Sequence, residues 1–282
     1  MAFYLGILIF SFIVTAIVIP IFINWLYATS PQHKNSLGGG VLVLIVVACL
    51  FALFFGLTRT VGIHVTSLFA LTQEVHVIFF AWKAFGLLGL FGQNLKYRAL
   101  YQLGLSSIVA LLLFINLKIH IVNILFFGVL DLSWGFIVFA IGVISLFIQG
   151  ISKTDEIDGL SPGVLLICLL ALWALSLQTV DTALSTFIAL WIGSLIAFLY
   201  FNIYPARILL GLPARLAFGA TLAVIGLLLG KTIALLVIGG IFWLASLVKV
   251  FEKAGWSKPK IMLRGWLMGV ILAIFGLWLA QL

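Results

Sequence analysis

Charged residues are scarce in this chain of 282 residues. Only 8% of the residues are Asp, Glu, Lys or Arg, whereas 65% are hydrophobic, and the mean hydropathy is +1.36. A soluble globular domain carries about 25% charged residues, so the composition excludes that class and indicates a chain that lies in a bilayer. The polar connections are too short to form a soluble module. We therefore expect residues 1–282 to form a single transmembrane domain.

Cysteine and metal-ligand patterns are also missing. The two cysteines, Cys49 and Cys168, lie inside apolar runs, so neither a disulfide nor a CxxC redox site is expected. The four histidines do not have the spacing of zinc ligands. The basic residues are spread over five loops with no soluble module to present them, which argues against nucleic acid as a partner.

Hydrophobic runs long enough to cross a bilayer occur about ten times along the chain. They predict an all-α polytopic membrane protein with about ten transmembrane helices. The segment 119–130 is apolar but too short to span, and we expect it to form an interfacial hairpin. The expected spans are 3–25, 40–58, 66–91, 99–117, 133–150, 161–180, 182–202, 207–229, 231–248 and 262–281.

Lysine and arginine are distributed unequally between the two sets of alternate loops. One set holds eleven of them and the other set holds three. Because basic residues accumulate in cytoplasmic loops, the richer set is expected to face the cytoplasm, with both chain termini outside. The membrane lipids that contact this basic side would be anionic.

Acidic residues are rare, and three of the seven fall in the loop SKTDEIDGL (152–160). Asp155 and Asp158 stand three residues apart and would share one face if the segment is helical. Two such carboxylates could hold Mg²⁺ or act as base and nucleophile. The alternative is that these carboxylates interact favourably with the helix dipole at the start of the following span.

A polar break without any acid separates two spans at 201–219 (FNIYPARILLGLPARLAFG). Its two arginines, Arg207 and Arg215, suggest a phosphate or an anionic lipid. A third cation, Lys83, lies about nine residues inside the third span, roughly 13 Å deep at 1.5 Å per residue. An ionisable residue at that depth is a functional-site hypothesis, with snorkelling as the alternative.

Four motifs, in order along the chain, resemble the polyprenyl-phosphate phospho-sugar transferases, and within that family the bacterial phospho-N-acetylmuramoyl-pentapeptide transferases. The resemblance covers nearly the whole chain. It rests on SLGGG (36–40), on TDEIDGL (154–160), on the break at 201–219, and on the tail FEKAGWSKPKIMLRGW (251–266). The matching residues are Thr154, Asp155, Asp158, Gly159 and Leu160; Asn202, Pro205, Ala206, Gly211, Leu216 and Gly219; Phe251, Glu252, Gly255, Trp256, Pro259, Arg264 and Trp266.

The departures from the family pattern fall on residues with a chemical role. The family's Mg²⁺-binding aspartate is replaced by Leu212, and its paired aspartates align with Gly92 and Gln93. Its histidine triplet becomes Val248, Lys249 and Val250. The resemblance therefore implies no metal ligand set and no cofactor here. The residual catalytic candidates are Asp155, Asp158 and Asn202.

Phosphoryl transfer depends on positioning and on neutralising charge, usually with metal ions, so these losses predict an impaired or inactive transferase. A pseudoenzyme of this kind would bind undecaprenyl phosphate or its sugar-linked form, or would regulate or scaffold an active transferase of peptidoglycan synthesis in the bacterial cytoplasmic membrane. The family forms dimers, so a homodimer or a mixed dimer is expected by resemblance.

Arginine suits phosphate oxygens, so a clamp for the lipid phosphate could consist of Arg98, Arg207 and Arg215, with Lys83 as a further candidate. The alternative is that these cations mark the interface and snorkel. Two other functions remain open: an active phospho-sugar transferase that uses a UDP-sugar and a rebuilt site, and a transporter of lipid-linked sugars.

Overall fold

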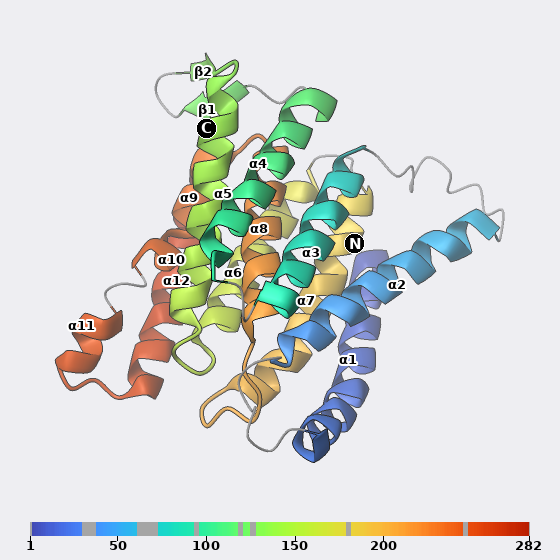
Figure 1. Ribbon diagram of the computed structural model, residues 1–282, viewed down its shortest axis with the longest axis vertical. Helices are drawn as coiled ribbons and strands as arrows, with labels where there is room; N and C mark the ends of the chain where they lie inside the picture. The colour runs from blue at the N-terminus through green and yellow to red at the C-terminus, as the bar shows by residue number, and fades with distance from the viewer. Residues whose placement is uncertain are drawn as a thin grey trace.

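The structure is a computed structural model that describes residues 2–29, 38–60, 73–92, 96–117, 121–124, 128–178, 182–244 and 248–281. These residues form a helical bundle with a small β-hairpin at one end (Figure 1). The helices are α1 (Ala2–Thr29), α2 (Gly40–Thr60), α3 (Gln73–Phe91), α4 (Arg98–Leu117), α5 (Gly135–Thr154), α6 (Leu160–Ser176), α7 (Thr182–Asn202), α8 (Leu212–Leu228), α9 (Thr232–Ile238), α10 (Gly240–Leu244), α11 (Val248–Lys253) and α12 (Lys258–Gln281). The strands are β1 (Ile121–Ile124) and β2 (Gly128–Asp131).

Six helices in the described part of the chain are long and apolar enough to cross a membrane: α1, α3, α4, α5, α7 and α12. Three shorter apolar helices, α2, α6 and α8, accompany them, with apolar parts of 17 residues or fewer. The expectation of an all-α polytopic membrane protein is therefore confirmed, whereas the number of ten spans is not.

The ninth expected span, 231–248, is wrong as a continuous helix. The chain forms two short helices there, α9 and α10, which are separated at Gly239. Glycine weakens a helix, and Gly239 and Gly240 stand together at this point. A side chain at Gly239 would meet the ring of Phe147, so the break also lets the chain at Gly239 and α10 lie close to α5.

Two other expected helix boundaries are also wrong. The span expected at 207–229 begins only at Leu212, because 203–211 form a loop and Pro213 favours a helix start. The span expected at 262–281 begins earlier, at Lys258. In the third expected span, residues 66–72 lie outside the described residues.

The expected hairpin at 119–130 is confirmed in position. Strands β1 and β2 pair antiparallel, with Ile121 opposite Asp131 and Ile124 opposite Gly128. Figure 1 places this hairpin at the end of the bundle where α4 ends and α5 begins. That it lies at the membrane interface stays a prediction.

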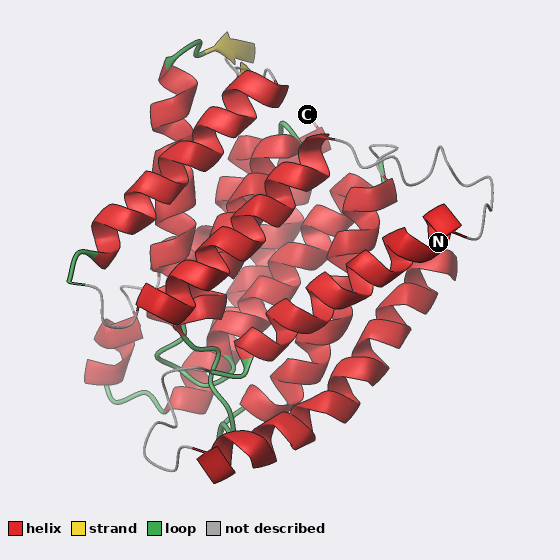
Figure 2. Ribbon diagram, turned by 45° about the vertical axis from the view of Figure 1, so that its right-hand side comes forward, coloured by secondary structure: helices red, strands yellow, loops and turns green. Residues whose placement is uncertain are grey.

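The chain has its loops at two opposite ends of the bundle (Figure 2). Helices α1 and α12 run in opposite directions, so the N- and C-termini both lie toward the hairpin (Figure 1). The loops 155–159 and 203–211 lie at the opposite end, which we call the site end. Termini on one side agree with the expected topology, and their position outside the cell stays a prediction.

The core is built around α7, the most buried of the spanning helices. Four aromatic side chains from three helices pack there: Trp82 of α3, Phe187 and Trp191 of α7, and Phe218 of α8. Trp82 donates its indole N–H to the carbonyl oxygen of Leu44 at 3.1 Å. This cluster ties α2, α3, α7 and α8 together, and these elements carry the site described next.

Candidate functional site

Two loops that are far apart in sequence are joined at the site end by the side chain of Asn202. Its Oδ1 accepts the N–H of Gly159 at 3.0 Å, and its Nδ2 donates to the carbonyl oxygen of Ile208 at 2.7 Å. Asp158 makes a second link, because its Oδ2 accepts the N–H of Ala206 at 3.2 Å. Asn202 and Asp158 therefore hold the loops 155–159 and 203–211 against each other.

Helix α12 covers the same junction. Trp266 donates its indole N–H to the carbonyl oxygen of Gly159 at 3.1 Å, and its ring occupies the space that a side chain at Gly163 would need. Gly159 has a φ of 76°, a conformation that favours glycine. The turn between α5 and α6 is thus fixed by contacts with α7 and α12.

The glycine-rich segment before α2 packs on the loop 203–211. The N–H groups of Gly39 and Gly40 donate to the carbonyl oxygens of Leu209 at 2.7 Å and Leu210 at 3.1 Å. A Cβ at Gly38 or Gly40 would clash with this loop's backbone. The N–H groups of Gly39 and Gly40 therefore already donate hydrogen bonds within the chain. The absence of side chains at these glycines lets the two backbone segments lie close together.

Asp155 and Arg215 form an ion pair across the site end. Asp155 follows the last residue of α5, and Arg215 lies in the first turn of α8. Nε of Arg215 lies 3.4 Å from Oδ2 of Asp155, and the two side chains are 27% and 5% exposed, respectively. Burial raises the pKa of Asp155 from 3.8 to about 7; the Arg215 guanidinium opposes this rise and the neighbouring Asp158 carboxylate adds to it.

The residues present do not fit a magnesium ion. Leu212 stands at the start of α8, half-buried against the hydrophobic core. Asp155 is paired with Arg215, and Asp158 accepts a backbone N–H. Mg²⁺ usually needs one or two carboxylates that can turn toward it. Within the described ranges, no three His, Cys, Asp or Glu side chains gather into a metal site.

The remaining arginine candidates border the two loops at different places. Arg98 is exposed at the start of α4, and its side chain lies beside Gly92. One turn earlier, Gly89 touches the backbone of Pro213, so this end of α3 lies next to the start of α8. Arg207 is exposed and borders a cavity of about 290 Å³. The other residues that line this cavity are Tyr200, Phe201, Ile203, Tyr204 and Pro205.

Lys83 lies apart from these arginines. It is exposed on α3, and its Nζ lies 5.5 Å from the centroid of the Phe79 ring. Phe79 is one turn closer to the start of α3, which is the direction away from the site end. The structure therefore does not bring Lys83 to the loops that carry the other phosphate candidates.

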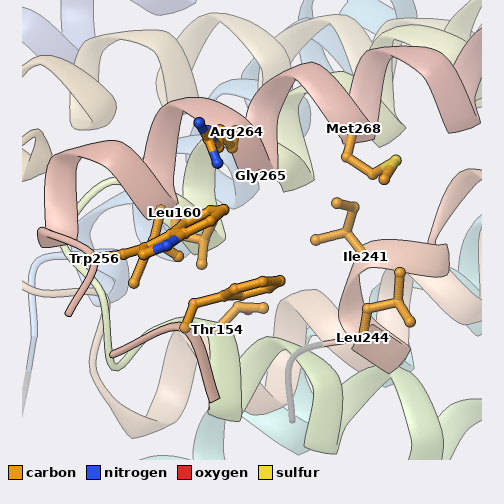
Figure 3. A pocket seen from close by; sticks show the side chains of 10 residues that line it. Thr154, Leu160, Ile241, Leu244, Trp256, Arg264, Gly265 and Met268 are labelled. Carbon is orange, nitrogen blue, oxygen red and sulfur yellow. The ribbon is translucent and has the colours of Figure 1, made fainter. Parts of the chain in front are cut away.

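An apolar pocket of about 250 Å³ opens beside the turn between α5 and α6 (Figure 3). Its lining residues come from α5, α6, α10, α11 and α12, together with the segment before α12: Thr154, Leu160, Ile241, Leu244, Phe251, Trp256, Ile261, Arg264, Gly265 and Met268. Figure 3 shows Arg264 and Trp256 near one end, and Ile241, Leu244 and Met268 near the other.

Arg264, a cation that lines this pocket, is held against an aromatic ring. The Arg264 guanidinium lies 4.1 Å from the centroid of the Trp256 ring, which itself stacks on Phe251 at 4.7 Å. The sequence signalled this region through the tail motif and, at Thr154 and Leu160, through the motif TDEIDGL. It gave no sign that Ile241 and Met268 would line a pocket, because both resemble ordinary residues of a membrane span.

The pocket and the ion pair share the segment that ends α5. Thr154 lines the pocket, and Asp155, the next residue, faces Arg215. Leu160, after the turn, returns the chain to the pocket wall. The site thus places an apolar space and a partly buried ion pair next to one short turn.

Comparison with known proteins identifies the class. Residues 75–230, more than half of the chain, match glycosyl transferase family 4, and the chain belongs to this family. The resemblance drawn from the four motifs is thereby confirmed.

Relatives with a named activity cover most of the chain. It is 27% identical to the phospho-N-acetylmuramoyl-pentapeptide-transferase of Staphylococcus aureus (strain bovine RF122 / ET3-1), over 79% of this chain and 83% of the relative. The protein of the same name from Bacillus velezensis is 23% identical over 96% of both chains. The one from Shouchella clausii is 27% identical over 98% of this chain and 97% of the relative.

Proposed function

We propose that this protein binds a polyprenyl phosphate, or its sugar-linked form, and does not transfer a phospho-sugar to it by a metal-dependent route. The observation that carries the proposal is the ion pair between Asp155 and Arg215, beside an apolar pocket. The names of the relatives support the class of ligand, since they transfer a phospho-sugar group. Such a protein would control the supply of the carrier, or pair with an active transferase as a mixed dimer.

The apolar pocket suits part of an isoprenoid chain. Its wall carries aliphatic and aromatic side chains, with Thr154 and Arg264 as the polar members. Because the lipid tail already lies in an apolar bilayer, its binding in the pocket gains little free energy from the hydrophobic effect. The pocket therefore selects its ligand by shape and packing. The affinity must therefore depend on the phosphate, for which arginine forks are well suited.

The same geometry opposes metal-dependent transfer. Asp155, a family-matched acid that directly follows the pocket residue Thr154, already has a cation in Arg215. Removing a single group that stabilises a developing charge costs about 10²–10³ in rate, and here several are replaced together. Binding of the carrier needs none of the replaced groups, so it is compatible with every departure from the family pattern.

A second candidate is an active transferase with a rebuilt site. It is favoured by the pKa of Asp155, which burial raises to about 7 and which would suit a general base at neutral pH. In this alternative, Arg215 would take over the neutralisation of charge that a metal ion supplies in the family pattern. Release of UMP from a UDP-sugar distinguishes the two candidates.

The binding proposal is tested by native mass spectrometry of the purified protein in detergent with undecaprenyl phosphate. Met268→Trp fills the pocket and should weaken binding of the lipid by about tenfold or more. Leu267→Trp is the matched control, because Leu267 is 65% exposed on the same helix and does not line the pocket. Equal binding by the wild type and both variants would show that the carrier does not use this pocket.

A further inference from the structure

Lys83 lies near the middle of a membrane-spanning helix. It follows the first residue of α3 by ten positions and precedes the last by eight. At 1.5 Å per residue these separations are about 15 and 12 Å. The hydrocarbon core of a bilayer is about 30 Å thick, so the residue belongs near its centre when α3 spans it.

The ammonium group does not reach toward the closer end of α3. A lysine that snorkels extends toward the nearer membrane surface, which here is the site end. Instead, Nζ of Lys83 lies over the ring of Phe79, one turn farther from that end. Phe79 packs against Phe51 of α2 at 4.8 Å, so the charge lies beside the contact between α2 and α3.

The face of α3 that carries Lys83 is exposed. Phe80, Lys83 and Leu87 are exposed and follow one another at helical spacing, whereas Ala81, Trp82 and Phe85 are buried. The buried side faces α8 through Gly89 and α2 through Trp82, which bonds to the Leu44 carbonyl. In Figure 1, α2 tilts away from α3 toward the end with the hairpin.

A cation on a lipid-facing surface at this depth needs a partner. Ionisable residues in membrane spans are costly and almost always pair with another group. The ring of Phe79 supplies a cation–π contact, which compensates only part of that cost. The described acids lie outside the middle of every spanning helix: Glu74, Asp131, Asp155, Glu156, Asp158 and Glu252.

We propose that the exposed face of α3 around Lys83 binds a transmembrane helix of another membrane protein that carries Asp or Glu at mid-membrane depth. Among its described residues, a second copy of this chain offers no acid at this depth. A lipid phosphate lies at headgroup depth and not at the bilayer centre. A carboxylate on a partner helix meets both requirements, depth and charge. This inference is independent of the carrier-binding proposal.

The test uses synthetic transmembrane peptides of leucine and alanine with one central Glu, Gln or Leu. The protein is labelled with a fluorescent donor at Cys49, which is exposed, while Cys168 is buried. Energy transfer to acceptor-labelled peptide is measured in phosphatidylcholine vesicles at several peptide-to-lipid ratios. We expect the Glu peptide to associate about threefold to twentyfold more strongly than the Gln and Leu peptides, the range found for polar contacts between membrane helices.

Three variants decide the role of Lys83. Lys83→Met should abolish the preference for Glu, and Lys83→Arg should keep it. Lys96→Met removes an exposed lysine outside the helices and should leave the preference unchanged. Equal association of the three peptides with the wild type, or a preference that survives Lys83→Met, would overturn the proposal. So would loss of the preference on adding phosphatidylglycerol, since a lipid phosphate would then be the partner.

Discussion

Arg215 lies with its Nε 3.4 Å from the Oδ2 of Asp155, and so joins the first turn of α8 to the end of α5. Both charges belong to the chain, which means that this cation stays in place whether or not a ligand is present. A metal ion bound between protein and substrate phosphates behaves differently, because it depends on both for its ligands. Arg215 therefore gives the site a cation whose presence does not depend on a bound ligand.

Acidification should stabilise the protein through Asp155. Burial raises its pKa from 3.8 to about 7, so between these values the folded protein holds a proton that the unfolded chain has released. The stabilisation from Asp155 is fully present below pH 3.8, the pKa of this group in the unfolded chain, and it is lost as the pH rises through about 7. We expect the free energy of unfolding to be larger at about pH 5 than at about pH 8, by on the order of 2 kcal/mol.

Asp155→Asn should remove this part of the pH dependence, because the amide cannot titrate. Thermal unfolding in one detergent at both pH values provides the measurement. Glu252→Gln serves as the control, since Glu252 is exposed on α11 and its replacement should leave the dependence in place. An unchanged pH profile in Asp155→Asn would contradict the burial of this carboxyl group.

Replacing Arg215 should affect stability in a pH-dependent way. Arg215→Met leaves a buried carboxylate without its cation; removing one partner of a buried pair costs about 3–5 kcal/mol, and the partial exposure of Arg215 reduces this to about 1–3 kcal/mol. The loss should be larger at about pH 8 than at about pH 5, where Asp155 is protonated. Arg207→Met, at an exposed arginine of the neighbouring loop, should show no such difference.

Asn202 should control the order of both loops at the site end. It is 1% exposed and bonds to Gly159 and Ile208 through its two amide atoms. Asn202→Ala leaves both buried backbone groups without partners, at a cost of about 1–3 kcal/mol each. Faster hydrogen exchange is expected in 157–160 and 203–211. Asn202→Asp keeps the acceptor for Gly159, so the amide of Gly159 should exchange more slowly in this variant than in Asn202→Ala.

Two glycines of α3 should respond in opposite ways to alanine. A Cβ at Gly89 would lie 2.2 Å from Cα of Pro213, a backbone atom that cannot move freely. Gly89→Ala should therefore lower stability by about 1–3 kcal/mol. At Gly86 the nearest atom is Cδ1 of Leu44 at 3.4 Å, and Gly86→Ala should gain up to about 1 kcal/mol from helix propensity. Thermal unfolding of both variants tests whether Gly86→Ala is more stable, and Gly89→Ala less stable, than the wild type.

The length of the hydrophobic runs predicted most of the fold. The runs that became α1, α5, α7 and α12 are long and uninterrupted, so their positions followed from composition alone. The segment at 231–248 looked equally apolar, yet Gly239 divides it into α9, which packs mainly on α12, and α10, which packs on α5. Apolar composition cannot distinguish a spanning helix from two short helices buried among their neighbours.

Only part of the candidate site could be predicted from the sequence. The motifs indicated Asp155, Arg215 and Asn202 as separate candidates. They did not predict that Asp155 and Arg215 would form an ion pair. That contact depends on the approach of α5 and α8, where a Cβ at Gly219 would meet the backbone of Ile148. The sequence suggested Asn202 as a residual catalytic candidate. Its two hydrogen bonds instead indicate that it positions the loops 155–159 and 203–211.

The central claim is that this chain binds a polyprenyl phosphate without transferring a phospho-sugar to it. The most direct test follows UMP release by the purified protein with undecaprenyl phosphate, a panel of UDP-sugars and Mg²⁺, with lipid binding measured in the same samples. We expect retained lipid, no UMP release, and weaker lipid binding in Arg215→Ala. UMP release that Asp155→Asn abolishes would contradict the claim and show an enzyme with a rebuilt site.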